Sequence, residues 1–365
     1  MINNKRQSNI ELLKIIAMFF ICISHVVNPI IYAGEFPAFT IGGELVYTFI
    51  KNLGWLGDYI FIAASAYFLV GNKKFNVKKF VLYYLEVLLV FFIYLGVFVL
   101  FKIPVSDIPT FEEAKRLTIN TLLIYKYWYI VAYLLFLVLL PLVNMLIDVL
   151  PRKVHLALCW VSIPFGLGAL VLHNTVFDAW WFDVYIFIFM TFIMSYGRRY
   201  GWYLCFREDN KKGLVIGLVS VTIFWILKNV IFSILGVYGY AYQPSSFSIA
   251  GLNDPLYFIF GITLFLLFKG MNIKNSKVIN FTSSLSLLFY VSHHNKYTSL
   301  VFEQPMMNLI SNNIKWRLMI LLAAAVARFV YGLVAASVMY FMVHIPLSLA
   351  MNVKIKKGKS NNISA

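Results

Sequence analysis

The chain has 365 residues, of which 61% are hydrophobic and only 13% are charged, about half the charged fraction of an ordinary globular protein. Its 34 Phe and 23 Tyr residues are spread from end to end, so too little polar material remains to cover an apolar core in water. The composition excludes a soluble protein, and we expect an integral membrane protein.

The net charge of +16 does not indicate nucleic acid as a partner. A protein that binds nucleic acid needs its basic residues on one water-facing surface, whereas here they occur in short runs between apolar segments. Anionic lipid headgroups in the membrane are the expected partner. The three cysteines are scattered and predict neither a disulfide framework nor a metal site.

A window of about 20 residues, the length that crosses a hydrocarbon core of about 30 Å, finds ten apolar segments. In chain order they cover residues 10–32, 55–71, 80–102, 122–147, 155–173, 178–197, 213–236, 252–269, 280–301 and 318–349. With the N-terminus inside, the inner connections contain twenty Lys and Arg residues and the outer ones five. The positive-inside rule therefore predicts an all-α, polytopic membrane protein with ten transmembrane helices and cytoplasmic termini.

We expect one transmembrane domain, residues 1–352, followed by a basic cytoplasmic tail, residues 353–365. The start of the chain imitates a signal peptide, but no small-x-small cleavage site follows, and we interpret it as a retained first span. The segment 318–349 is longer than one span needs, which predicts either a strong tilt or an initial helix on the outer surface.

The first span has one polar stripe. At 100° per residue, Glu11, Lys14, Cys22, His25 and Asn28 fall within roughly 60° of one direction, while apolar residues cover the rest of the helix. His25 lies about 22 Å above the cytoplasmic end of this helix. Ionisable residues inside spans are costly and normally face the protein interior, so His25 is a candidate functional residue.

Other polar residues fall at a comparable height and predict a cavity that opens to the outside. They are Asp58, Lys126, Asp183, Lys228, Asp254, His293, His294 and Asn295. A neutral imidazole there can take a proton from a hydroxyl. A carboxylate such as Asp58 or Asp183 would hold its other nitrogen, and the sequence does not choose between the two.

Several further residues have two readings. Lys228 and Arg328 lie deep in spans, where an ion pair is the default expectation. Glu86, in the inner half of the third span, is expected to orient a basic residue of the loop below it. Trp128 and Tyr129 lie at an outer boundary, where they serve either as interface anchors or as walls of a substrate site.

Five segments resemble, in order, the signatures of acyltransferase family 3, a family of integral-membrane O-acyltransferases. The first is residues 9–25, a charged start followed by an apolar run that ends in a functional histidine. The others are residues 56–68, the basic loop 73–79, residues 127–142 and residues 285–295. The similarity covers nearly the whole chain, including the number and orientation of the spans.

The resemblance implies an enzyme that moves an acyl group, usually acetyl, from cytoplasmic acyl-CoA to a hydroxyl of an outer sugar or cell-envelope glycan. The location would be a bacterial plasma membrane, crossed many times. His25 would be the catalytic residue, and Asp58, His293 and His294 are further catalytic candidates. No metal is implied.

The basic residues on the inner side would meet the phosphates of acetyl-CoA. The candidates are Lys73, Lys74, Lys78, Lys79, Arg198 and Arg199. Where the family often has two arginines three apart, this chain has Lys78 and Lys79 followed by Leu82, and lysine lacks the bidentate fork of arginine. Acceptor binding is assigned to Lys126, Trp128, Tyr129 and Asn295.

Two functions from other classes use a similar architecture. A transporter of a glycan or lipid-linked sugar would have the same polar cavity, but alternating access favours two repeated halves with broken helices, and no such repeat is visible. A polysaccharide polymerase would carry a large outer loop rich in arginine, whereas the loops 33–54 and 103–121 contain few basic residues. The transporter is the main alternative.

Overall fold

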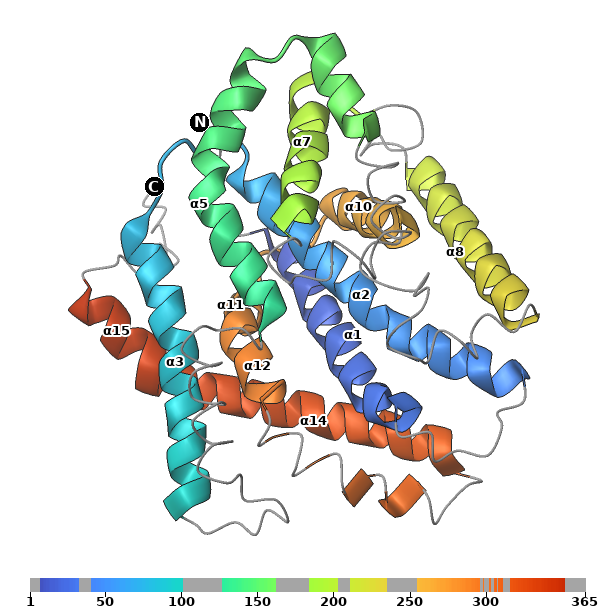
Figure 1. The fold of residues 1–365 in the computed structure, drawn as a ribbon, viewed down its shortest axis with the longest axis vertical. Helices are drawn as coiled ribbons and strands as arrows, with labels where there is room; N and C mark the ends of the chain where they lie inside the picture. Colours follow the sequence, from blue (N-terminus) through green and yellow to red (C-terminus); the bar gives the residue numbers. More distant parts are fainter. Residues whose placement is uncertain are drawn as a thin grey trace, which may run out of the picture.

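The computed structural model describes residues 7–32, 41–100, 127–161, 184–202, 211–234, 255–295 and 316–351, with isolated positions between 298 and 310. In these residues every regular element is a helix, and the helices pack into one bundle (Figure 1). The all-α prediction is confirmed. Lys126, Asp183 and Asp254 lie outside the described residues.

The helices are α1 (Ser8–Tyr32), α2 (Ile41–Leu69), α3 (Val77–Leu100), α5 (Trp128–Val149), α7 (Val184–Tyr200), α8 (Lys211–Ile234), α10 (Pro255–Lys269), α11 (Lys277–Ser284), α12 (Ser286–His293), α14 (Arg317–Met339), the π-helix η4 (Tyr340–His344) and α15 (Ile345–Ala350). A further helix covers residues 152–161. Each predicted span overlaps one helix, except the ninth, which overlaps α11 and α12, and the tenth, which overlaps α14, η4 and α15.

Within the described residues, four helical stretches are long and apolar enough to cross a membrane: Ser8–Val27, Val77–Val97, Trp128–Val149 and Arg317–Ala350. Large apolar side chains such as Ile216, Phe224 and Met319 are exposed, as lipid-facing residues are. The protein is thus a membrane protein. Ten spans and cytoplasmic termini stay predictions.

Helices α1 and α2 form the most extensive helix pair of the bundle. Gly57 permits the close approach, because a Cβ atom there would lie 2.7 Å from the carbonyl oxygen of Ala17. At the far end of the pair, the Ser24 hydroxyl donates to the carbonyl of Lys51 at 2.6 Å. Most of the other helices pack against α1 or α2.

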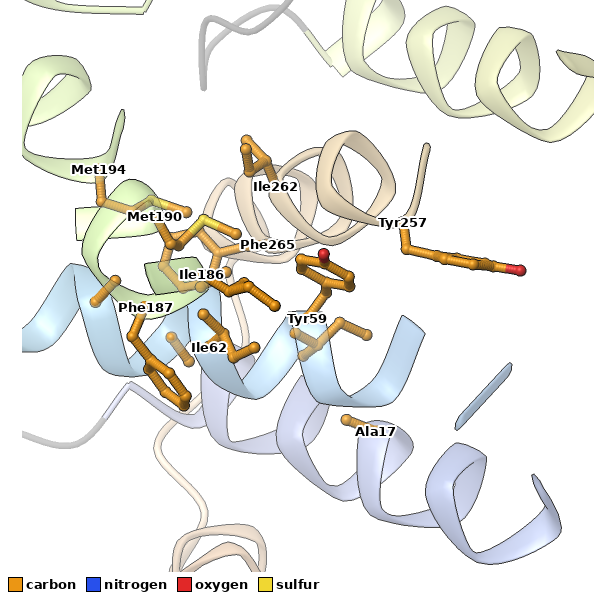
Figure 2. Packing of buried hydrophobic residues seen from close by; sticks show 14 of the residues in the cluster. Ala17, Tyr59, Ile62, Ile186, Phe187, Met190, Met194, Tyr257, Ile262 and Phe265 are labelled. Atoms are coloured by element: carbon orange, nitrogen blue, oxygen red, sulfur yellow. The ribbon is translucent and has the colours of Figure 1, made fainter. Parts of the chain in front are cut away.

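A large apolar core lies on the α2 side of this helix pair, between α1, α2, α5, α7 and α10 (Figure 2). Ile62 of α2, Phe187 and Met190 of α7 and Phe265 of α10 are fully buried in it. A second core joins α1 to α3, α5, α12 and α14 through residues such as Cys22 and Phe289. The two cores hold α1 on both sides, which fixes the helix that carries His25.

Several helix termini meet at one end of the bundle. The Asn9 side chain donates to carbonyls of Phe268, Lys269 and Met271 at 2.9–3.1 Å. Lys269 also lies over the ring of Tyr67, 4.7 Å from its centroid. We call this the basic end, comprising the start of α1, the ends of α2, α5, α7 and α10, the α2–α3 connection and the first turn of α3. His25 lies far along α1 from it.

The ninth predicted span, 280–301, is not one helix. It breaks at Leu285 into α11 and α12, and α12 ends at His293. Helix α14 approaches α12 closely at Gly332, where a Cβ atom would lie 2.6 Å from the Phe289 ring. The His293 side chain, at the end of α12, lies at the level of His25.

The tenth predicted span is one helical stretch from Arg317 to Ala350 with a π-helical turn inside it. Pro346 follows this turn and has no backbone N–H, so the carbonyl four residues earlier cannot make its α-helical bond. The amide of Ile345 bonds the Tyr340 carbonyl, five residues back. The local widening accommodates the proline without ending the helix.

Candidate active site

Two histidines from distant parts of the chain form a hydrogen-bonded pair. Nδ1 of His25, on α1, lies 3.1 Å from Nε2 of His293, at the end of α12. His293 is completely buried, whereas His25 is partly exposed. The pair therefore has one inner member, enclosed by protein, and one outer member that keeps part of its surface exposed.

The backbone fixes the tautomers of both rings. Nδ1 of His293 lies 2.8 Å from the carbonyl oxygen of Phe289, and because a carbonyl only accepts, this nitrogen carries the proton. Nε2 of a neutral His293 is then an acceptor, and Nδ1 of His25 must donate to it. The lone pair of His25 is left on Nε2, which is the arrangement that a general base requires.

A third histidine covers the pair. The ring of His294 stacks on His25 with centroids 4.2 Å apart and planes 23° apart. His294 also contacts the rings of Tyr127 and Tyr290. The structure thus brings three of the four predicted catalytic residues together, and His294 fixes the orientation of the His25 ring from its face.

Side chains hold the end of α12. The Asn295 amide donates to the Ser292 carbonyl at 2.8 Å and accepts from the Thr298 amide at 2.8 Å. The Thr298 hydroxyl donates to the same Ser292 carbonyl at 2.7 Å. Asn295, a predicted acceptor-binding residue, is buried and uses its amide to close the helix that carries His293.

Asp58, the remaining predicted catalytic residue, is buried on α2. Its carboxylate interacts electrostatically with the hydroxyls of Tyr129 and Tyr290. The expected position of a carboxylate at Nδ1 of His25 is occupied by His293 instead. Asp58 is therefore an acidic group beside two tyrosines, one of which packs on His294.

The predicted acceptor residues Trp128 and Tyr129 lie at the start of α5 and are both partly buried. Their rings contact each other, with centroids 5.6 Å apart, and Trp128 also faces Trp55 at 6.2 Å. Tyr129 packs on Tyr290 at 6.0 Å and so adjoins the histidine cluster. An aromatic wall thus borders the three histidines.

Three of the predicted phosphate-binding cations have partners within the protein. At the basic end, Asp148 of α5 forms ion pairs with both Lys73 and Arg199. Arg199 also donates to the Ile147 carbonyl at 2.7 Å. Arg198 donates to the Tyr67 carbonyl at 2.9 Å, at the end of α2. These contacts tie α2, α5 and α7 together.

The other three predicted cations belong to the α2–α3 connection and to the first turn of α3. Lys74 and Lys78 are exposed, and Lys79 is half-buried with its ammonium 5.4 Å from the centroid of the Tyr83 ring. They are the better placed of the six predicted residues to meet an external anion.

Glu86 has a different partner from the one expected. Its buried carboxylate lies 2.5 Å from Nδ1 of His344 on η4, and the loop residues below α3 are not among its contacts. The ring of His344 stacks on Tyr340. The Glu86–His344 pair joins α3 to the widened turn of the last helix. The sequence gives no sign of this pairing, because the two residues are 258 positions apart.

Comparison with known proteins identifies the family of the chain. No curated protein and no solved structure matches the chain. A family described as an acyltransferase domain, acyltransferase family 3, matches residues 7–341, which include the three histidines and the cations of the basic end. The chain therefore belongs to acyltransferase family 3 and is a membrane acyltransferase.

Proposed function

We propose that the protein moves an acetyl group from acetyl-CoA, on the cytoplasmic side, to a hydroxyl of a sugar or cell-envelope glycan on the outer side, with His25 as general base. The observation that carries the proposal is the His25–His293 hydrogen bond of 3.1 Å, locked by the Phe289 carbonyl. It leaves the lone pair of His25 on Nε2. The site would lie in a plasma membrane crossed by ten helices.

In the first step, Nε2 of His25 takes the proton of the acceptor hydroxyl while its oxygen attacks the thioester carbonyl. The His25 ring becomes positively charged, and its Nδ1–H bond to His293 strengthens because the donor is now ionised. Buried His293 thus serves the role that a carboxylate has in other acid–base pairs.

In the second step, the tetrahedral adduct collapses. The carbon–sulfur bond breaks, the electron pair leaves with the thiolate of CoA, and His25 returns its proton to that sulfur. The products are an ester and a free thiol, so His25 ends neutral and no net proton is consumed. A positioned acid–base group of this kind contributes about 10² to 10⁴ in rate.

For the donor, we propose that Lys74, Lys78 and Lys79 bind the phosphates of CoA. The support is that Lys74 and Lys78 are exposed and Lys79 is partly so, whereas Lys73 and Arg199 are already paired with Asp148. Lysine binds phosphate as a point charge and gives affinity with little orientation. Orientation of the donor must then come from its acyl-bearing arm, which reaches toward His25.

For the acceptor, we propose a sugar that lies against the aromatic wall of Trp128 and Tyr129. Sugar rings present apolar faces that pack on aromatic side chains, and partly buried aromatic residues provide such surfaces. Asp58, which interacts with the Tyr129 hydroxyl, would stabilise this wall. Lys126, outside the described residues, stays a prediction for the same site.

The test is mass spectrometry of cell-envelope glycans from cells that have the protein, lack it, or carry His25→Ala. The proposal expects an acetyl group on a glycan hydroxyl in the first case alone. Identical spectra from all three would contradict it. Transport of labelled glycan across proteoliposomes without acyl-CoA would favour the transporter instead.

A further inference from the structure

Arg328 of α14 is one of the largest fully buried side chains in the described residues, with 1% of its surface exposed. A guanidinium group stays charged at any physiological pH, and burying it in a membrane protein is costly unless polar groups surround it. Residues of this kind are retained where they do something that an apolar side chain cannot.

The contacts of Arg328 reach both members of the histidine pair. Nη2 donates to the carbonyl oxygen of His293 at 2.9 Å, and Nη1 donates to the carbonyl oxygen of His25 at 3.3 Å. The fork of one guanidinium therefore bridges the backbones of α1 and α12 at the two residues whose rings are hydrogen-bonded.

The sequence explains why these two carbonyls accept from a side chain. In a continuous α-helix the His25 carbonyl would bond the amide four residues later, but that residue is Pro29, which has no N–H. The His293 carbonyl lies in the last turn of α12, where carbonyls have no partner within the helix. Arg328 donates a hydrogen bond to each of these two carbonyls, and its positive charge interacts favourably with a helix C-terminus.

We infer that Arg328 is a positioning residue that holds the His25 and His293 backbones at the separation their ring hydrogen bond needs. The inference rests on the proposed role of His25 as base. Arg328 does not touch the reacting atoms. It acts because a displacement of about 1 Å between α1 and α12 would break the His25–His293 bond and release the tautomer of His25, and displacements of that size cost about 10² in rate.

A lysine at position 328 cannot reproduce this bridge. Its ammonium is a point donor on a flexible stem, whereas the planar fork places two N–H groups at fixed positions. It can reach one carbonyl and keeps the charge. Arg328→Lys thus separates the two-point bridge from the presence of a cation.

The experiment combines kinetics with nitrogen-15 NMR of the wild-type protein, Arg328→Lys and Arg328→Met, each purified in lipid nanodiscs with labelled histidine. The wild type should give Nδ1–H tautomers at His25 and His293, assigned by His25→Asn and His293→Asn. In Arg328→Met we expect the fixed Nδ1–H signal of His25 to be lost, and kcat to fall about a hundredfold with unchanged KM for acetyl-CoA. Arg328→Lys should lose about tenfold, because one of two hydrogen bonds remains.

The matched control is Lys228→Met, which removes another cation from inside a predicted span. Lys228 was expected near His25, but it belongs to α8, which packs mainly on α10 and α2, and it lies over the Tyr257 ring at 5.8 Å. It should leave both the histidine signals and kcat at the wild-type level. Wild-type signals in Arg328→Met would overturn the positioning role, whether or not kcat falls.

If Arg328→Met does not fold, the double variant Pro29→Ala with Arg328→Met carries the test. An alanine at position 29 supplies the amide that the His25 carbonyl lacks, since α1 stays helical through Tyr32. The His293 carbonyl remains open, so kcat should still be reduced, and a wild-type kcat would refute the inference. If the wild type transfers no acyl group but the histidine signals change when Arg328 is substituted, the proposed function fails and the positioning role stands.

Discussion

The basic end and the histidine cluster both gather polar side chains from distant helices, but they use them differently. At the basic end, Asp148 is paired with Lys73 and Arg199, and Arg198 is bonded to a backbone carbonyl. Each contact satisfies a charge or a helix terminus. These side chains tie α2, α5 and α7 together and have little capacity left for a ligand.

In the histidine cluster, the hydrogen bonds leave one reactive atom available. The chain of donors runs from His25 Nδ1 to His293 and from His293 Nδ1 to the Phe289 carbonyl, so Nε2 of His25 keeps its lone pair. The difference teaches that the kind of residue does not decide its role. The role depends on whether neighbouring groups occupy all of the residue's hydrogen-bonding atoms or leave one atom accessible in a fixed direction.

The largest expected effect comes from removing that atom. His25→Ala should reduce kcat by about 10² to 10⁴, because the acceptor hydroxyl loses its base. The protein should stay folded, since His25 is partly exposed. Radiolabelled acetyl transfer by the purified protein in nanodiscs measures the loss.

The matched control is His155→Ala. His155 is fully buried, and its Nε2 lies 2.8 Å from the Phe192 carbonyl and 3.0 Å from the Ser195 hydroxyl. Its Nδ1 is enclosed by protein, so no atom of this ring can meet a substrate. We expect this variant to lower thermal stability but to keep kcat. If His155→Ala loses transfer as completely as His25→Ala while both remain folded, the distinction between the two kinds of region is wrong.

The second effect concerns the inner ring of the pair. His293→Leu removes the acceptor for His25 Nδ1 and should reduce kcat about a hundredfold through loss of orientation. His293→Gln keeps a carbonyl that can accept and should lose less, on the order of tenfold. KM for acetyl-CoA should not change in either. Equal kcat values for the two variants would mean that His293 contributes shape and not a hydrogen bond.

Most of the fold was predictable because long apolar runs give helices and little else in a membrane. The break at Leu285 was not, since residues 280–301 contain neither proline nor glycine, the residues that most often interrupt a helix. The π-helical turn before Pro346 had a local cause, but a proline alone does not say whether a helix ends, kinks or widens.

The candidate site was predictable in part. The polar stripe of the first span identified His25, but its partner was expected to be a carboxylate and is His293, which lies 268 positions away. Because Pro29 has no backbone N–H, the sequence shows that the His25 carbonyl, four residues earlier, has no α-helical partner. Nothing in the nearby sequence indicated that Arg328 would donate to this carbonyl, because Arg328 belongs to another helix, which packs beside both histidines.

A smaller effect is expected from two lysines in the first turn of α3. Lys78→Gln with Lys79→Gln should raise KM for acetyl-CoA about tenfold with a smaller change in kcat, because two exposed ion pairs of about 0.7 kcal/mol each sum to that factor. Charge contacts far from the reacting carbon bind ground and transition states alike. Insertion must be checked by cysteine accessibility, since the same charges orient the chain. An unchanged KM would leave these lysines as topology signals only.

The smallest effect should come from Asp148→Asn, which frees Lys73 and Arg199 at once. Because all three side chains are partly exposed, the ion pairs contribute about 1 kcal/mol or less, and a small drop in the thermal unfolding temperature is expected with kcat unchanged. The informative quantity is KM for acetyl-CoA. If Lys73 and Arg199 serve only to tie helices together, KM stays at the wild-type value. A lower KM would show that the freed cations bind the donor and that Asp148 competes with it for Lys73 and Arg199. The basic end would then resemble the histidine cluster, in that its side chains take part in substrate binding.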